Sequence, residues 1–109
     1  MLAELLGSQT SEKVLLYLVA QGRGYSSEIA KAFKISNTQV LRTIHKLEQA
    51  DILVGQDHGR VRLYSFNPRW FLAPELESLL KKALLQIPLD KQEQYFSKRS
   101  RPRKKGKAL

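Results

Sequence analysis

The middle third of the chain changes its hydrophobic period once, and this change constrains the fold more than any other feature of the sequence. Val40, Ile44 and Leu47 recur at the spacing of one helix face. Ser36 and Gln39, three residues apart, form a capping-box pattern at the start of that helix. We therefore expect a well-defined helix from about residue 37 to residue 50.

An alternating pattern follows this helix at once. Residues 52–56 indicate a strand, Asp57-His58-Gly59 a tight turn, and residues 60–66 a second strand that Asn67-Pro68 ends. One face of the second strand carries Val61, Leu63 and Ser65, and the other carries Arg60, Arg62, Tyr64 and Phe66. The pattern predicts a two-stranded hairpin.

Two helical segments precede this unit. The first begins near Thr10 or Ser11 and ends at Gly22 and Gly24. Its apolar face consists of Val14, Leu15, Leu18 and Val19, with Tyr17 at its edge. The second is short, with Ser26 as the expected N-cap and Glu28 in the first turn. Residues 33–36 then form a turn of the length found in helix-turn-helix units.

A further amphipathic helix is predicted for residues 74–87, with Pro74 in its first turn and Pro88 after its end. Asp90 and Glu93 form a second capping-box pattern, which predicts a short helical extension over residues 89–97. Three helices, a hairpin and another helix are the order of a winged helix-turn-helix domain. We therefore expect a mainly α protein with a small β-hairpin, made of a three-helix core, a two-stranded wing and a C-terminal helix.

Composition excludes several classes of protein. A chain of 109 residues has room for one core, here assigned to residues 1–88. Cysteine is absent, which removes disulfides, thiolate catalysis and cysteine-ligated metal sites. The longest apolar run, residues 14–20, is far shorter than the roughly 20 residues of a membrane span. We expect a cytoplasmic, nucleoid-associated protein that does not contact a membrane.

Positive charge is concentrated at the C-terminal end. Residues 1–97 hold twelve Lys or Arg and ten Asp or Glu, whereas residues 98–109 hold seven basic residues and no acidic one. The basic residues of this tail are Lys98, Arg99, Arg101, Arg103, Lys104, Lys105 and Lys107. Such a tail is expected to be disordered when free. A DNA-grasping arm, an RNA-binding segment, an import-like signal and a solubilising appendage are the alternatives.

The outward face of the helix over residues 37–50 has the chemistry of a DNA-reading surface. It presents Asn37, Thr38, Gln39, Arg42, Thr43 and Lys46. Arg can pair with guanine, and Asn or Gln with adenine, when a helix enters the major groove. Residues 31–46 contain four basic side chains and no acidic one. The alternatives are a solvated helix face and simple helix capping.

Further DNA contacts are expected on both sides of this helix. His58, Arg60 and Arg62 are candidates in the wing, where edge-strand charges that discourage aggregation are the alternative. Ser26, Ser27 and Lys34 are candidates for the DNA backbone near the second helix. No catalytic constellation or phosphate-binding glycine loop is present, so we do not expect an enzyme.

Parts of the sequence resemble the arsenic-repressor-like winged-helix transcriptional regulators of bacteria and archaea. The resemblance is strongest in residues 27–30, 35–44 and 47–53. Residues 6–8, 64–68 and 74–76 are similar to a subgroup found alone or beside nucleotidyltransferase modules. The resemblance implies operator binding by a symmetric dimer, with the third helix in the major groove and the wing along the flanking minor groove.

The chain departs from the family pattern at Asp51, where Gly is common, and at Leu41, where many members carry a small polar residue. Asp tolerates the left-handed backbone conformation, so we expect the turn to be kept. The family's metal sensors use cysteines, and this chain offers only His45 and His58, so we expect no metal and no cofactor. The pattern identifies no small-molecule effector.

The apolar face of the helix over residues 74–87 is broad for one small domain. We expect it to form a homodimer interface through Leu76, Leu80, Ala83, Leu84 and Ile87, with Leu5 and Tyr17 nearby. Packing against the first helix is the alternative. The sequence thus predicts a sequence-specific, double-stranded-DNA-binding regulator of transcription, a repressor that acts by occupying promoters. A protein-interaction module with nonspecific nucleic-acid binding through the tail, or an RNA-binding protein, is the alternative.

Overall fold

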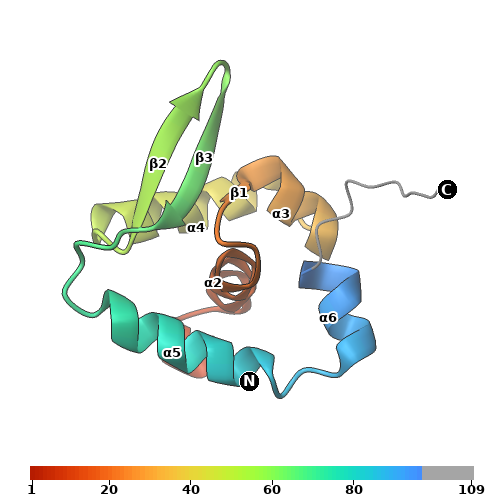
Figure 1. Cartoon of the computed structure of the whole chain (residues 1–109). Helices are drawn as coiled ribbons and strands as arrows, with labels where there is room; N and C mark the ends of the chain where they lie inside the picture. The colour runs from red at the N-terminus through yellow and green to blue at the C-terminus, as the bar shows by residue number, and fades with distance from the viewer. Residues whose placement is uncertain (97–109) are drawn as a thin grey trace, which may run out of the picture.

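The computed structural model describes residues 1–96 of the chain (Figure 1). The helices are α1 (Ala3–Leu6), α2 (Gln9–Gln21), α3 (Ser26–Phe33), α4 (Asn37–Gln49), α5 (Ala73–Leu84) and α6 (Leu89–Phe96). The strands are β1 (Gly24–Tyr25), β2 (Leu53–His58) and β3 (Val61–Phe66). This order confirms the predicted winged helix-turn-helix fold, and α1 and β1 are additions that the pattern did not predict.

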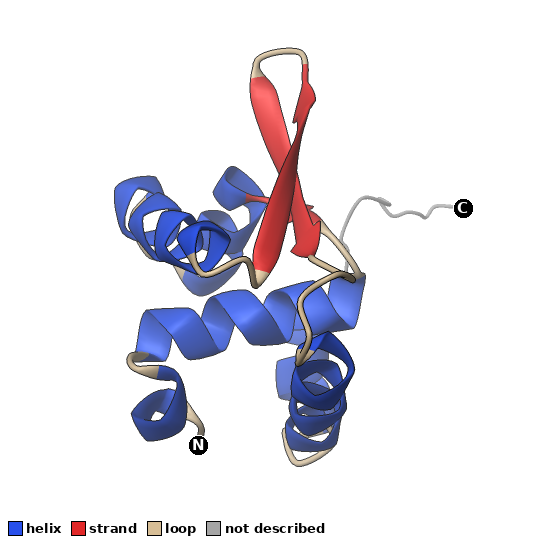
Figure 2. Ribbon diagram, turned by 90° about the vertical axis from the view of Figure 1, so that its left-hand side faces the viewer, coloured by secondary structure: helices blue, strands red, loops and turns tan. Residues whose placement is uncertain are grey.

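Helix α2 lies at the centre of the molecule. Figure 2 shows it between two layers, with α3, α4 and the hairpin on one side and α1 and α5 on the other. All residues from Val14 to Leu18 are buried, so α2 is covered all round rather than on the single face that was predicted. It begins at Gln9, one or two residues before the predicted start at Thr10 or Ser11, because the Ser8 side chain accepts a hydrogen bond from the backbone amide of Ser11.

Helices α3 and α4 form the helix-turn-helix. The N-cap of α3 is Tyr25 and not Ser26 as predicted, because the Glu28 carboxylate accepts a hydrogen bond from the Tyr25 amide. The α4 cap is as predicted, because the Ser36 hydroxyl accepts a hydrogen bond from the backbone amide of Gln39 at 3.1 Å. Ile29 of α3 and the pair Val40 and Ile44 of α4 are fully buried, which holds both helices against α2.

Strands β2 and β3 form the wing, a long antiparallel hairpin that rises from the body (Figure 1). Its pairing runs from Leu53 opposite Phe66 to His58 opposite Val61, so the turn is Gly59-Arg60 and not Asp57-His58-Gly59 as predicted. Gly59 takes a φ of 64°, which suits glycine at this turn position.

The sheet has three strands in the order β1-β3-β2, rather than the two predicted. Gly24 pairs with Tyr64 and Tyr25 with Leu63, so β1 lies along the base of the wing. Asp51, at the turn between α4 and β2, has a φ of 65°, which confirms that the turn tolerates aspartate there.

The C-terminal helices cover two different surfaces of α2. Helix α5 packs along α2 and ends at Leu84, three residues before the predicted end. Helix α6 packs against α2 and α3, where the Phe33 ring stacks on Tyr95 at 5.1 Å and meets Phe96 edge-on at 5.5 Å. No helix within residues 1–96 has the length and apolar character needed to cross a membrane.

The apolar face of α5 is used within the protomer. Leu80 is fully buried and Ala83 is buried, so these two predicted dimer contacts have no surface to offer to a second copy. Leu76, Leu84 and Ile87 are partly buried and pack against the same core, and Tyr17 of α2 is buried. Leu79 and Leu85 remain exposed on and after α5, as does Leu5 of α1.

Candidate nucleic-acid interface

The outward face of α4 is directed to solvent, as its helical period predicted. Asn37, Thr38, Arg42 and Lys46 are exposed, and Thr43 is half-buried. The opposite face is fixed by the fully buried Val40 and Ile44, while Leu41 is partly buried and packs against the core. Within residues 1–96, neither Arg42 nor Lys46 takes part in an ion pair. Both cations can therefore reach a partner outside the domain.

Gln39 differs from the other residues of this face. Its side-chain Nε2 donates a hydrogen bond to the Thr10 hydroxyl of α2 at 2.8 Å. The expected role of Gln39 as a base-reading side chain thus has an intramolecular competitor. In this structure, Gln39 holds the first turn of α4 against α2.

The residues expected near the DNA backbone lie at the two ends of α3. Ser26 and Ser27 follow β1 directly, so they lie beside the base of the wing. Ser27 is exposed and Ser26 is half-buried. Lys34 is exposed in the turn before α4, where it adopts a left-handed conformation with φ of 57°. The fold therefore places these three residues at opposite ends of α3 rather than in one cluster.

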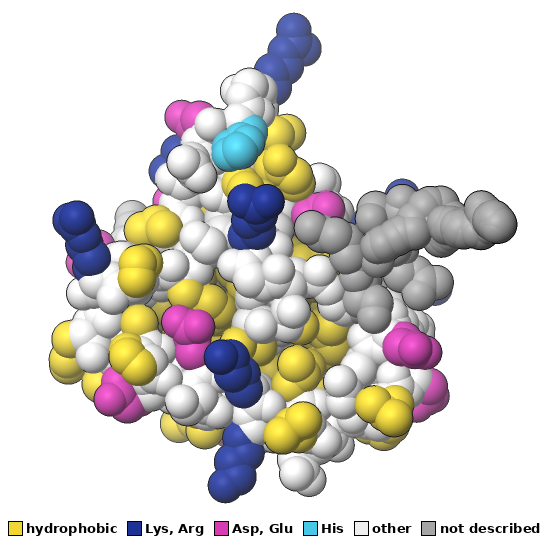
Figure 3. All heavy atoms as spheres, in the orientation of Figure 1, with side chains coloured by type: hydrophobic (Ala, Val, Ile, Leu, Met, Phe, Trp, Pro, Cys, Tyr) yellow, Lys and Arg dark blue, Asp and Glu magenta, His cyan; other side chains and the backbone are white. Residues whose placement is uncertain are grey.

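The outer part of the wing, residues 56–62, is exposed and mostly polar. His58 and Arg60 are exposed at and beside its turn, and Figure 3 shows a basic side chain projecting from that tip. On the face in Figure 3, the basic side chains stand apart from one another over the body of the domain. Among residues 1–96, no three His, Asp or Glu side chains lie close enough to hold a metal ion.

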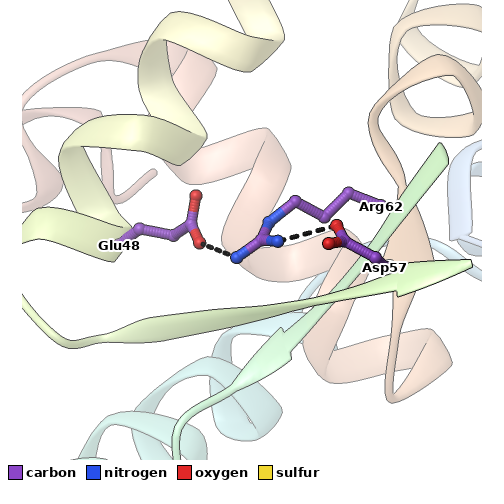
Figure 4. Close-up of polar contacts among 3 residues, drawn as sticks. All are labelled: Glu48, Asp57 and Arg62. Carbon is purple, nitrogen blue, oxygen red and sulfur yellow. Dashed lines mark hydrogen bonds and ion pairs between the residues drawn. The ribbon is translucent and has the colours of Figure 1, made fainter. Parts of the chain in front are cut away.

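Arg62 is also exposed, but it is engaged by two carboxylates of its own chain (Figure 4). Its Nη1 donates to Asp57 Oδ1 at 2.8 Å across the hairpin, and its Nη2 lies 3.3 Å from Glu48 Oε2 in the last turns of α4. The hydrogen bonds to Asp57 and then Glu48 raise the pKa of the Arg62 guanidinium above its ordinary value. We call this three-residue arrangement the Arg62 bridge. The prediction that placed Arg62 with the other wing cations did not include these partners.

One signal in the sequence could have indicated half of this bridge. Asp57 and Arg62 are directly opposite each other in the hairpin, and opposite charges at such positions pair readily. The expected turn at residues 57–59 hid this pairing, because it placed Asp57 outside the strands. The partnership with Glu48 depends on how the wing leans on α4, which no local pattern specifies.

Two buried tyrosines, Tyr17 and Tyr64, have raised pKa values. Burial raises the pKa of Tyr17 in α2, and the nearby Glu28 carboxylate raises it further. Burial also raises the pKa of Tyr64 at the base of the wing, with a further contribution from Glu48. Both phenols therefore hold their protons more tightly in the folded protein than an exposed tyrosine does.

The helix-turn-helix, its hairpin and the placement of α4 define a winged helix-turn-helix protein. No family model matches the chain, and no curated protein matches it. A solved structure with a similar fold is the adhesin competence repressor (AdcR) from Streptococcus pyogenes. The similarity has a TM-score of 0.55 and 23% sequence identity, and covers 79% of this chain and 72% of that chain. The likeness shows the fold, whereas the arsenic-repressor-like subgroup stays a prediction.

Proposed function

We propose that the chain is a sequence-specific, double-stranded-DNA-binding regulator of transcription that represses by occupying its operator. Helix α4 would lie in the major groove, and the wing would lie along the flanking groove. The observation that carries this proposal is the outward face of α4, where Arg42 and Lys46 are exposed beside a projecting hairpin. The name of the similar structure, a repressor, supports the same reading.

We further propose that the protein binds as a homodimer, with two copies of α4 entering successive major grooves about 34 Å apart. The buried Leu80 and Ala83 are unsuited to this contact, so the exposed Leu79, Leu85 and Leu5 are better candidates for the interface. The basic residues expected to add phosphate contacts, residues 98–109, lie outside the described part of the chain. A protein of this kind would act on the nucleoid in the cytoplasm, without an enzymatic step.

The test is selection from a random duplex library near physiological salt, with the full chain and with a version that ends at Ser97. Enrichment of one motif by both proteins, with half-sites one helical turn apart, is the expected result. If nothing is enriched and binding disappears with the tail, the core is a protein-interaction module. The exposed side chains of Phe71, Leu85 and Leu89 are the apolar surface that such a module would use.

A further inference from the structure

The outer half of the wing has little apolar contact with the body of the domain. Leu53 and Tyr64, at the base of the hairpin, are buried, but every residue from 56 to 62 is exposed. The orientation of this half relative to α4 is therefore not set by the hydrophobic core. A polar contact between the outer half and α4 would set this orientation.

The Arg62 bridge is such a contact. Arg62 and Asp57 belong to opposite strands of the outer wing, and Glu48 belongs to α4 (Figure 4). A guanidinium presents several donors in one plane, so it can hold two carboxylates at once, which an ammonium group does less well. The bridge joins both strands of the wing to the helix that the proposed function places in the major groove.

Gly55 provides the space for this arrangement. It lies opposite Tyr64 in the hairpin, with the Arg62 side chain lying across it. A Cβ atom added at Gly55 would lie within 2.8 Å of the Arg62 Cζ atom and closer still to Nε. Because Gly55 does not have a positive φ, alanine fits its backbone, and the expected cost is confined to the displaced arginine. Glycine is usually disfavoured within a strand. The room that it leaves for the Arg62 side chain is a structural reason for its presence at position 55.

We infer that Arg62 is a positioning residue that holds the outer wing at a fixed orientation to α4, and not a residue that contacts DNA phosphates. Its charge is already shared between Asp57 and Glu48, whereas Arg60 at the tip forms no ion pair within residues 1–96. The inference rests on the proposed function for its DNA readout, but the rigidity of the wing, which a fixed orientation requires, can be measured without DNA.

The first test measures backbone motion of the free full-length chain by amide ¹⁵N heteronuclear NOE over residues 56–62. Gly55→Ala displaces the guanidinium and keeps every charge, and Arg62→Gln removes the guanidinium. Both variants are expected to lower the NOE across the wing, and Arg60→Gln, the matched control for charge, is expected to leave it unchanged. A wing that keeps its wild-type NOE in both Gly55→Ala and Arg62→Gln overturns the inference.

The second test measures affinity for the selected duplex as a function of salt. Loss of the bridge is expected to weaken binding about threefold to tenfold, as suits one or two exposed ion pairs, with the salt slope of the wild type. Arg62→Lys, which keeps the charge and loses the planar fork, is expected to behave like Gly55→Ala. A salt slope reduced by about 1 in Arg62→Gln, with wild-type binding by Arg62→Lys, would instead show a direct phosphate contact. If the wild type selects no duplex, the proposed function fails, and the NOE measurement still decides the role of Arg62.

Discussion

The side-chain amide of Gln39 in α4 donates a hydrogen bond to the hydroxyl of Thr10 in α2, with Nε2 and Oγ1 2.8 Å apart. Apart from tyrosines, Thr10 is the one polar side chain among residues 1–96 that is buried, and it lies 29 positions before its partner. The bond joins the first turn of the proposed recognition helix to the central helix. That turn also carries Asn37 and Thr38, so the bond fixes the end of α4 from which these side chains project.

We predict that Thr10→Val, which keeps the shape of the side chain, lowers the free energy of unfolding by about 1 kcal/mol, because it removes the acceptor of this bond. Urea unfolding of the full chain measures the change. Thr38→Val, on the exposed face of α4, is the control and should stay within about 0.5 kcal/mol of the wild type. Equal stability of the wild type and Thr10→Val would show that the bond contributes nothing.

Arg42 and Lys46 are predicted to contribute to DNA binding in different ways. Arg42→Ala should cost about 1 to 3 kcal/mol with the preferred duplex and relax the preference at one base pair, as expected for an arginine paired to guanine. Lys46→Ala should weaken all duplexes alike and reduce the salt slope by about 1. Fluorescence anisotropy with preferred and scrambled duplexes, at a series of salt concentrations, separates the loss of a base contact from the loss of a phosphate contact. Lys91→Ala, an equal loss of charge on α6, should change neither quantity.

Removal of residues 98–109 takes away seven positive charges and no negative one. We predict weaker binding to every duplex by a similar factor and a flatter dependence on salt, because fewer counterions are released from the DNA. Titrations of several sequences at a series of salt concentrations give both values. A changed sequence preference in the shortened chain would mean that the tail reads bases.

Stability should fall at alkaline pH because of Tyr17 and Tyr64. The pKa of each is raised above the ordinary 10.0, so the unfolded chain releases its phenolic protons at a lower pH than the folded chain does. The contribution of the two phenols to the free energy of unfolding is therefore complete below pH 10 and is lost as the pH rises beyond it. Urea midpoints on both sides of this value measure the loss. Tyr64→Phe should show a smaller alkaline decline, and an identical decline would argue against Tyr64 as its source.

The contact of α6 with α3 depends on the Phe33 ring. We predict that Phe33→Leu lowers the free energy of unfolding by about 1 kcal/mol, because leucine keeps apolar contact but loses the stacking on Tyr95 and the edge contact with Phe96. Thermal unfolding followed by circular dichroism is a suitable measurement. Phe71→Leu is the matched control, since Phe71 is 80% exposed and should tolerate the change.

Helices α2 to α6 could be predicted because their signals are local, whereas the single turn of α1 was not. The cap at Ser36 and the buried stripe of Val40 and Ile44 lie within one short segment, and the structure has the helix there. Strand β1 could not be predicted in the same way. Two residues, Gly24 and Tyr25, are too few to show a period, and they become a strand only by pairing with β3 some forty positions later.

The candidate site, too, could be predicted only where the signal is local. Helical geometry alone places Arg42 and Lys46 on the outside of α4, and the structure agrees. The partners of Gln39 and Arg62 depend instead on contacts between separate elements, α4 with α2 and α4 with the wing. Side chains of the same chemical type on one surface can thus have different partners, and only the tertiary structure distinguishes them.

The burial of the middle of α2, from Val14 to Leu18, also bears on how substitutions away from α4 and the wing would act. Every layer of the domain packs on this one helix, so the surface formed by α4 and the wing has no core of its own. A small domain of this kind is expected to unfold in one cooperative step. If the proposed function holds, substitutions at Val14 or Leu18 would therefore reduce the amount of folded protein without altering its choice of DNA sequence, and a genetic screen for loss of repression would recover α2 as readily as α4.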